Sequence, residues 1–175
     1  MSQTALISIL SEDRVGLIAE VTGRLYELGI NLGDTSFAVL GSGADFTTVA
    51  ELPDDLTHAR IRTDLAGLPT LKGAKISVEP FSYRAHHGES ANITHRIEIS
   101  GEDSPGLVAR LSETFVGFGA NIVQLNSERI PGGKEFRYVT RIAVWIAPDK
   151  AKACLATVAN TAEELRMTCN VTKAG

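Results

Sequence analysis

The sequence predicts an α+β protein made of two tandem βαββαβ domains, each with a four-stranded antiparallel sheet and two helices on one face. The first observation is an internal repeat: Ser11–Leu32 aligns without a gap with Gly101–Ile122, with seven identities in 22 positions. The second is that each copy alternates strand-like and helix-like hydrophobic patterns in the same order. We therefore expect a first domain over residues 1–81, a polar linker over 82–91 and a second domain over 92–175.

Each copy begins with an apolar strand and an amphipathic helix. The strand residues are Leu6, Ile7, Ile9 and Leu10 in the first copy, and Ile97 and Ile99 in the second. The apolar helix positions follow in steps of one, three, four and three, the pattern of a helix with one buried face. They are Leu17, Ile18, Val21, Leu25 and Leu28, repeated as Leu107, Val108, Leu111, Phe115 and Phe118.

The ends of these helices also carry signals. We expect Ser104 to cap the second-copy helix and Pro105 to occupy its first position. Gly29 and Gly119 stand where a helix ends in a left-handed residue, and we expect both to adopt that conformation.

A hairpin, a second helix and a last strand complete each copy. The hairpins join Asn31–Leu40 to Asp45–Leu52, and Asn121–Ile130 to Glu135–Ile146. The same gapless register aligns Phe46 with Phe136 and Asp45 with Glu135. The second helices are expected to open at Pro53-Asp54 and at Pro148-Asp149, and the last strands to span Ala74–Glu79 and Met167–Thr172. Two helices cover one face of such a sheet. We therefore expect the open face to meet the other copy or a second chain.

The composition disfavours several classes of protein. With 43% hydrophobic and 22% charged residues, the chain is typical of a soluble globular protein. The net charge of −4 and the lack of a Lys or Arg run disfavour direct nucleic-acid binding, which normally requires a basic face. The N-terminus has neither the basic region nor the cleavage site of a secretion signal, and no apolar stretch is long enough to span a bilayer. We expect a cytoplasmic protein without membrane or nucleic-acid partners.

Catalytic, metal and cofactor sites are also absent from the sequence pattern. The histidines lie outside the repeated motifs, and His86-His87 on a polar segment is a weak metal site. We expect Cys154 to lie in the core and Trp145, near a strand end, to serve packing. Gly41-Ser42-Gly43 lacks the third glycine of a dinucleotide-binding loop, because position 46 is Phe46. The sequence therefore predicts a protein that is not an enzyme and holds no metal or cofactor.

A pair of motifs occurs twice in the same order: Asp-x-x-Gly-Leu leading into a helix, then Gly-x-Asn opening the next strand. The first pair is Asp13-Arg14-Val15-Gly16-Leu17 with Gly29-Ile30-Asn31; the second is Asp103-Ser104-Pro105-Gly106-Leu107 with Gly119-Ala120-Asn121. With these motifs the chain resembles the ACT domain family, whose domains are ferredoxin-like. As two such domains it is similar to the glycine cleavage system transcriptional repressor group. Its first loop is also similar to the loop that opens formyltetrahydrofolate deformylases.

The resemblance implies a regulatory function. ACT domains bind an amino acid or a similar small ligand at domain interfaces and so regulate a partner, here a protein such as a transcriptional activator. The open sheet face of each copy, which must meet the other copy or a second chain, favours a homodimer. The candidate ligand-binding residues are Asp13, Arg14, Val15, Gly16, Leu17 and Asn31 in the first copy, and Asp103, Ser104, Gly106, Leu107 and Asn121 in the second.

The chemistry of these residue types suits an amino acid. Backbone N–H groups at a helix N-terminus attract a carboxylate, and a glycine such as Gly16 lets the ligand approach the main chain. The amide of Asn31 both donates and accepts hydrogen bonds, and Asp13 is a candidate acceptor for the ammonium group. Pro105 has no N–H group to offer, so the two sites differ; if only one of them binds, we expect it to be the first.

Structural roles remain open for the same residues. An aspartate before a helix commonly caps it, glycine commonly serves a tight turn, and asparagine after a glycine commonly bonds the turn. The alternative functions are a ligand-independent protein-interaction module that docks through its open sheet face, and a stand-alone relative of the ACT regulatory segment of formyltetrahydrofolate deformylase.

Overall fold

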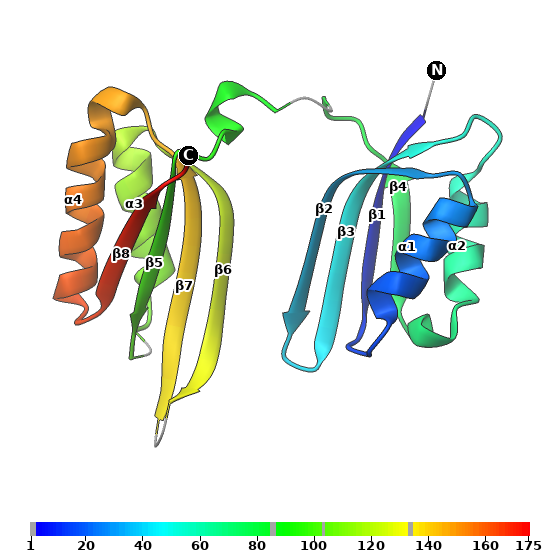
Figure 1. The fold of residues 1–175 in the computed structure, drawn as a ribbon, viewed down its shortest axis with the longest axis horizontal. Coiled ribbons are helices and arrows are strands. Elements are labelled where there is room, and N and C mark those ends of the chain that lie inside the picture. Colours follow the sequence, from blue (N-terminus) through cyan, green and yellow to red (C-terminus); the bar gives the residue numbers. More distant parts are fainter. Residues whose placement is uncertain (1–2, 85–86, 103, 133–134) are drawn as a thin grey trace. The chain divides into compact units, whose positions relative to one another are not determined.

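Both halves of the chain form the expected four-stranded antiparallel sheet with two helices on one face (Figure 1). The computed structural model describes residues 3–84, 87–102, 104–132 and 135–175, and it divides into two units, Met1–Tyr83 and Arg84–Gly175. The first unit consists of β1 (Gln3–Glu12), α1 (Leu17–Glu27), β2 (Asn31–Leu40), β3 (Gly43–Leu52), α2 (His58–Ala66), η1 (Pro69–Leu71) and β4 (Lys75–Pro80), with strand order β2-β3-β1-β4.

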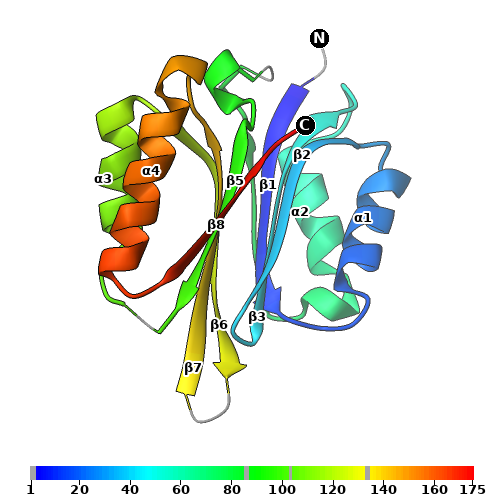
Figure 2. The ribbon, with the colours of Figure 1, turned by 60° about the vertical axis from the view of Figure 1, so that its left-hand side comes forward.

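The second unit repeats this topology. It consists of η2 (Glu89–Ala91), β5 (His95–Gly101), α3 (Leu107–Phe118), β6 (Asn121–Gly132), β7 (Glu135–Trp145), α4 (Pro148–Glu164) and β8 (Thr168–Lys173). The strand order is β6-β7-β5-β8, and α3 and α4 cover one face of the sheet (Figure 2). The 3-10 helix η2 lies within the stretch expected to be a linker, and it packs on β6 and β7.

Alternation along the central strands decides which face is buried. In β1, Ala5, Ile7 and Ile9 face the helices and are almost fully buried, while the residues between them face the other side of the sheet. The stripe predicted for α1 supplies the opposite wall of this core through Leu17, Val21 and Leu25. In the second unit β5 and α3 build the same core with Ile97, Ile99, Leu107, Leu111 and Phe115.

Two predicted helix starts are wrong. Helix α3 begins at Leu107 with Gly106 as its N-cap and without a side-chain cap, so neither Ser104 nor Pro105 holds its expected place. The reason is that Leu107 N–H bonds the Ser104 carbonyl across a turn that precedes the helix. In the first unit Pro53 likewise heads a turn, and α2 begins at His58 behind the capping hydroxyl of Thr57. Helix α4 does begin at Pro148, as expected.

The helix C-termini follow the sequence prediction. Gly29 has φ +72° and Gly119 has φ +66°, both in the left-handed region. Beyond them the chain enters β2 and β6, the edge strands that carry the two repeated asparagines.

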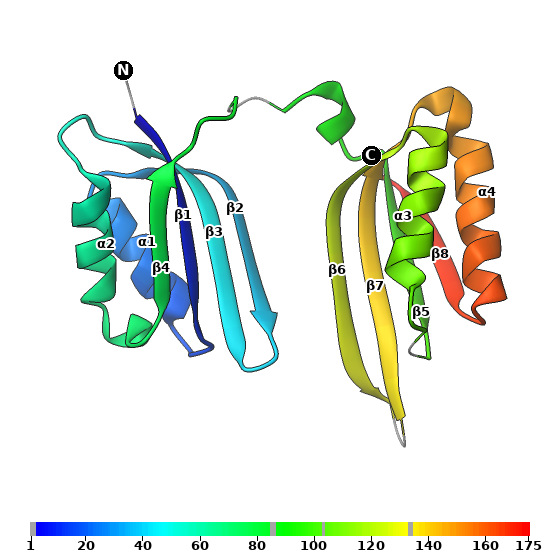
Figure 3. The same ribbon diagram turned by 180° about the vertical axis from the view of Figure 1, so that it is seen from behind.

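The gapless register fails at the second hairpin. Ile9 pairs with Phe46, whereas the equivalent Ile99 pairs with Thr140, not with the expected Phe136. In the first hairpin Leu40 pairs with Gly43, three positions later. In the second hairpin Ile130, the counterpart of Leu40, pairs with Arg137, seven positions later. Four extra residues therefore lengthen the second hairpin beyond β5 (Figure 3). Phe136 lies in this extension and is 64% exposed, while Phe46 is 1% exposed.

None of the helices formed by the described residues has the length and apolar character needed to cross a bilayer.

Candidate functional site

The loop between β1 and α1 ends on a left-handed glycine. Gly16 is the N-cap of α1 with φ +90°, and no side chain caps the helix. Asp13 therefore does not serve as a cap; its N–H donates to the carbonyl of Ser42, 2.9 Å away, and so ties the loop to the β2–β3 turn. Val15 is fully exposed at the tip of the loop.

The charged and apolar flanks of this loop have separate roles. Arg14 donates to Glu12 at 2.6 Å, so its guanidinium is held beside the strand end. Leu17 is 2% exposed and anchors the start of α1 in the core. Of the predicted loop residues, Leu17 is thus structural, while Val15 and Gly16 present an open main chain.

The second loop also ends on a left-handed glycine. Gly106 is the N-cap of α3 with φ +87°, again without a side-chain cap, and Leu107 is buried. Ser104 is half-buried and its carbonyl closes the turn at Leu107. Asp103 lies outside the described residues. In both units the first helical N–H group, that of Leu17 or Leu107, bonds the carbonyl three residues earlier. The next N–H groups of each helix have no partner within the helix and face solvent or a ligand.

Substitution of Gly16 tests its conformation. Gly16→Ala should cost the first unit about 1–2 kcal/mol of unfolding free energy, because an L side chain is strained in the left-handed region. Gly23 inside α1 is the matched control: the space around both glycines is open within 4 Å, but only Gly16 has positive φ. Gly23→Ala should stabilise by about 0.5–1 kcal/mol. Shifts of the same sign in the thermal midpoint would contradict the assigned conformation.

The repeated asparagines lie at the other end of each sheet from the loops. Asn31 pairs with Glu51 at the start of β2, whereas Gly43, beside the loop, pairs with Glu12. Eight strand positions separate Gly43 from Glu51, a distance of roughly 26 Å. In the second unit Gly101, at the end of β5 that leads to the loop, pairs with Tyr138, and Asn121 pairs with Trp145 seven positions later, roughly 23 Å away. The structure therefore does not bring the loop and the asparagine of one unit into one site.

The two asparagines have different partners. Asn31 Nδ2 donates to Glu51 Oε2 at 3.3 Å, and both side chains are exposed. Asn121 Nδ2 donates to the main-chain carbonyl of Ser90 in η2, at 2.9 Å. Sequence reasoning missed Glu51 and Ser90, because neither belongs to a repeated motif. Only the strand register and the position of η2 identify them.

Titratable groups elsewhere do not form a reactive centre among the residues that the structure describes. Burial, followed by the charge of Lys173, lowers the pKa of His95 at the start of β5. Arg141, on the open face of the second sheet, donates hydrogen bonds to the carboxylates of Glu128 and Glu98, and these bonds raise its pKa. No group of three or more His, Cys, Asp or Glu residues suited to a metal ion occurs within the described ranges, and His86 lies outside them.

The two cysteines are free thiols and differ in access. Cys154 is completely buried in the second core, as expected, and Cys169 is half-buried. Burial raises the pKa of both thiols, so a smaller fraction is thiolate at a given pH and alkylation is slowed. We expect iodoacetamide to label Cys169 first and Cys154 only after unfolding, as followed by peptide mass spectrometry. Equal labelling of Cys154 in the native protein would contradict its burial.

Solved structures with this fold match the whole chain. A protein of unknown function from Galdieria sulphuraria is 20% identical, with a TM-score of 0.76 over 100% of both chains. A protein assigned as a glycine cleavage system transcriptional repressor is 15% identical, with a TM-score of 0.67 over 99% of this chain and 98% of that one. The predicted resemblance is thereby confirmed for the fold: the chain consists of two tandem ferredoxin-like, ACT-like domains arranged along the chain as in the repressor.

Sequence comparison matches less of the chain. A UPF0237 protein from Streptococcus mutans is 25% identical over 75 residues, which are 43% of this chain and 85% of that protein. A UPF0237 protein from Streptococcus pneumoniae gives the same values. No protein-family model matches the chain.

Proposed function

We propose that this protein is a non-enzymatic, cytoplasmic regulator that senses an amino acid and controls a partner protein such as a transcriptional activator. The observation that carries the proposal is the pair of helix N-termini at Gly16 and Gly106, both left-handed and both without a side-chain cap. Beyond the first helical N–H group, which bonds a carbonyl of the preceding turn, each offers further backbone N–H groups and the positive end of a helix dipole, which suit the carboxylate of an amino acid. The likeness in fold to a transcriptional repressor supports a regulatory role.

The acidic charge supports action through a protein rather than through DNA. The chain has a net charge of −4, and phosphate binding would need a basic face. The open sheet face of the second unit does carry Arg96 and Arg141, but Glu98 and Glu128 bond Arg141 and offset part of this charge. The partner is thus expected to be recognised as a protein surface.

A ligand that contacts both a loop and an asparagine requires two copies of the domain. The loop and Asn31 lie at opposite ends of one sheet, so one small molecule cannot touch both within a unit. We propose a homodimer in which β2, an edge strand, faces a second chain in antiparallel fashion. In such an arrangement the start of β2 in one chain, which carries Asn31, lies near the end of β2 in the other chain, which is the end beside the loop.

A thermal-shift panel of the common amino acids tests the function. A ligand at a hundredfold excess over its Kd should add about 2.7 kcal/mol to the stability of the folded state. Gly16→Ala should reduce the shift caused by the ligand, whereas Gly23→Ala should preserve it. The proposal fails when none of the amino acids raises the unfolding midpoint of the wild-type protein.

A second candidate is a constitutive interaction module. The observation in its favour is the exposed apolar surface on the open face of the first sheet, where Leu10 is 47% and Leu40 59% exposed. Such a module would bind its partner with equal affinity in the presence and absence of every amino acid. Substitution of Gly16 and Asn31 would also leave that affinity unchanged.

A further inference from the structure

A row of four side chains crosses the open face of the first sheet at the end where β2 starts. Asn31 pairs with Glu51, and Glu51 pairs with Thr4 on β1. Phe81 continues the row beside β4, because its N–H donates to the Thr4 carbonyl at 2.9 Å. Neighbours in such a row are about 5 Å apart, and they lie on one face. The row therefore reads amide, carboxylate, hydroxyl, aromatic ring.

The row is on the solvent side of the sheet. Ala5, Ala50 and Leu52, which flank it along the strands, are buried against the helices. Since strand side chains alternate between faces, Thr4 and Glu51 point the other way. The aromatic end is widened by Tyr83, whose ring lies 5.6 Å from that of Phe81 in an edge-on arrangement and is itself exposed.

The second unit replaces this row at two of its four positions. Asn121 pairs with Trp145, and His95 pairs with Val144, so Thr94, the residue before β5, continues the row beyond Trp145. Ala174 ends the row by donating its N–H to the Thr94 carbonyl. Asparagine and threonine are thus kept, while tryptophan stands for Glu51 and alanine for Phe81.

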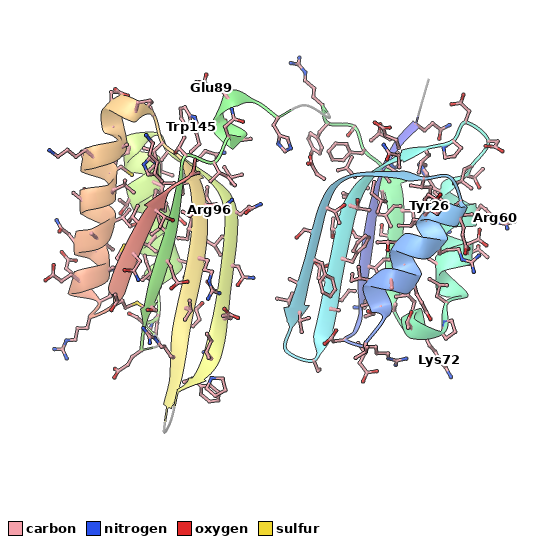
Figure 4. All side chains as sticks on the ribbon, viewed as in Figure 1. Tyr26, Arg60, Lys72, Glu89, Arg96 and Trp145 are labelled. Carbon is pink, nitrogen blue, oxygen red and sulfur yellow. The ribbon has the colours of Figure 1, made fainter. Side chains whose placement is uncertain are left out.

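The second row is also occupied by the chain itself. The Asn121 amide donates to the Ser90 carbonyl, and η2 packs on β6 and β7 at this end. Figure 4 shows Trp145 and Glu89, the first residue of η2, at the same end of the second unit. The Thr94 hydroxyl is also engaged, since it accepts from Ile146 N–H at 2.9 Å and donates to the Val144 carbonyl.

We propose that the first row receives the ammonium group of the amino-acid ligand, with Glu51 as its charged acceptor, and that the second row has become the anchor of η2. This inference rests on the proposed sensing function and deepens it. An ammonium group has three N–H donors, which Glu51, the Asn31 carbonyl oxygen and the Thr4 hydroxyl can accept. Phe81, next to Thr4 in the row, supplies an aromatic ring with which a cation can interact. The second row offers no carboxylate, and its amide is already bonded.

Isothermal titration with matched ligands tests the ammonium site. The probes are each common amino acid and, for every one that binds, the 2-hydroxy acid that replaces the ammonium with a hydroxyl. Glu51→Gln should weaken amino-acid binding about ten- to a hundredfold and change hydroxy-acid binding by less than about twofold. Glu79→Gln is the control, because Glu79 lies on the same face of β4 but outside the row.

The outcomes separate this inference from the function on which it rests. If the wild-type protein binds no amino acid, the sensing function fails and the inference with it. If the wild type binds and Glu51→Gln binds equally well, the sensing function stands and the ammonium site is overturned. If Glu51→Gln weakens hydroxy-acid binding as much as amino-acid binding, the ammonium site is also overturned, since Glu51 would then support the folded structure and would not contact the ammonium group.

The anchor in the second unit has its own readout. Asn121→Ala should speed hydrogen exchange at the amides of Ala91 and Asn92, which close η2 on Gly88 and Glu89. It should leave amino-acid affinity within about twofold of the wild type. Unchanged exchange in η2 overturns the anchoring role, and a loss of amino-acid binding overturns the division of roles between the two rows.

Discussion

Phe46→Ala is expected to lower the unfolding free energy of the first unit by about 3–5 kcal/mol, the range for removing a buried aromatic ring. Phe46 is 1% exposed and belongs to the core cluster that β1, α1 and α2 close. A loss of this size is a large part of the roughly 5–15 kcal/mol that holds a small domain folded. Chemical denaturation, followed together with hydrogen exchange in β1 and β3, measures it.

Phe136→Ala provides the matched control. The gapless repeat aligns Phe136 with Phe46, yet Phe136 is 64% exposed in the hairpin extension. Its removal should change stability by no more than about 0.5 kcal/mol, as for other surface substitutions. Similar losses at both positions would show that the gapless register holds and that the extension is misplaced.

The fold followed from local signals in the sequence. Period-two strands, the helical stripe that starts at Leu17 and the left-handed glycines at Gly29 and Gly119 are short-range patterns, and each occurs twice. Because the order of elements was repeated, few topologies remained. The element types were confirmed. Apart from the register of the second hairpin, the corrections concern helix starts, where a turn and the first turn of a helix look alike in sequence.

Local signals in the sequence did not predict the pairing of the strands or the position of the candidate site. The register of β7 depends on four extra residues in a hairpin, which an alignment through Phe46 and Phe136 does not reveal. Gly16 and Asn31 are only 15 residues apart in the sequence, but helix α1 between them runs back along the sheet. The two residues therefore lie about one strand length apart. Glu51 becomes a candidate only once its pairing with Asn31 is known.

The structure shows a further difference between the two copies that the sequence did not reveal. In the sequence, the difference is that Pro105 removes one N–H group from the second loop. At the other end of the sheet, Asn121 bonds Ser90, whereas Asn31 bonds an exposed carboxylate. Both differences favour ligand binding in the first unit, and they arise from residues that lie far apart.

Phe115→Ala is expected to have the other large effect, a loss of about 3–5 kcal/mol in the second unit. Phe115 is 1% exposed and is the largest fully buried side chain of α3. Helical periodicity predicted this burial, because Phe115 lies four positions after Leu111 on the same stripe. Urea unfolding of the variant measures the loss.

Val116→Ala tests the same stripe from the next position along α3. Val116 is 76% exposed, so it points away from the core and its truncation removes little buried surface. We expect a change within about 0.5 kcal/mol, because alanine is also the better helix former. A cost at Val116 comparable to that at Phe115 would mean that another chain covers this side of α3. The helical side of the second unit would then be an interface as well, and its open sheet face would not be the only surface available to a partner.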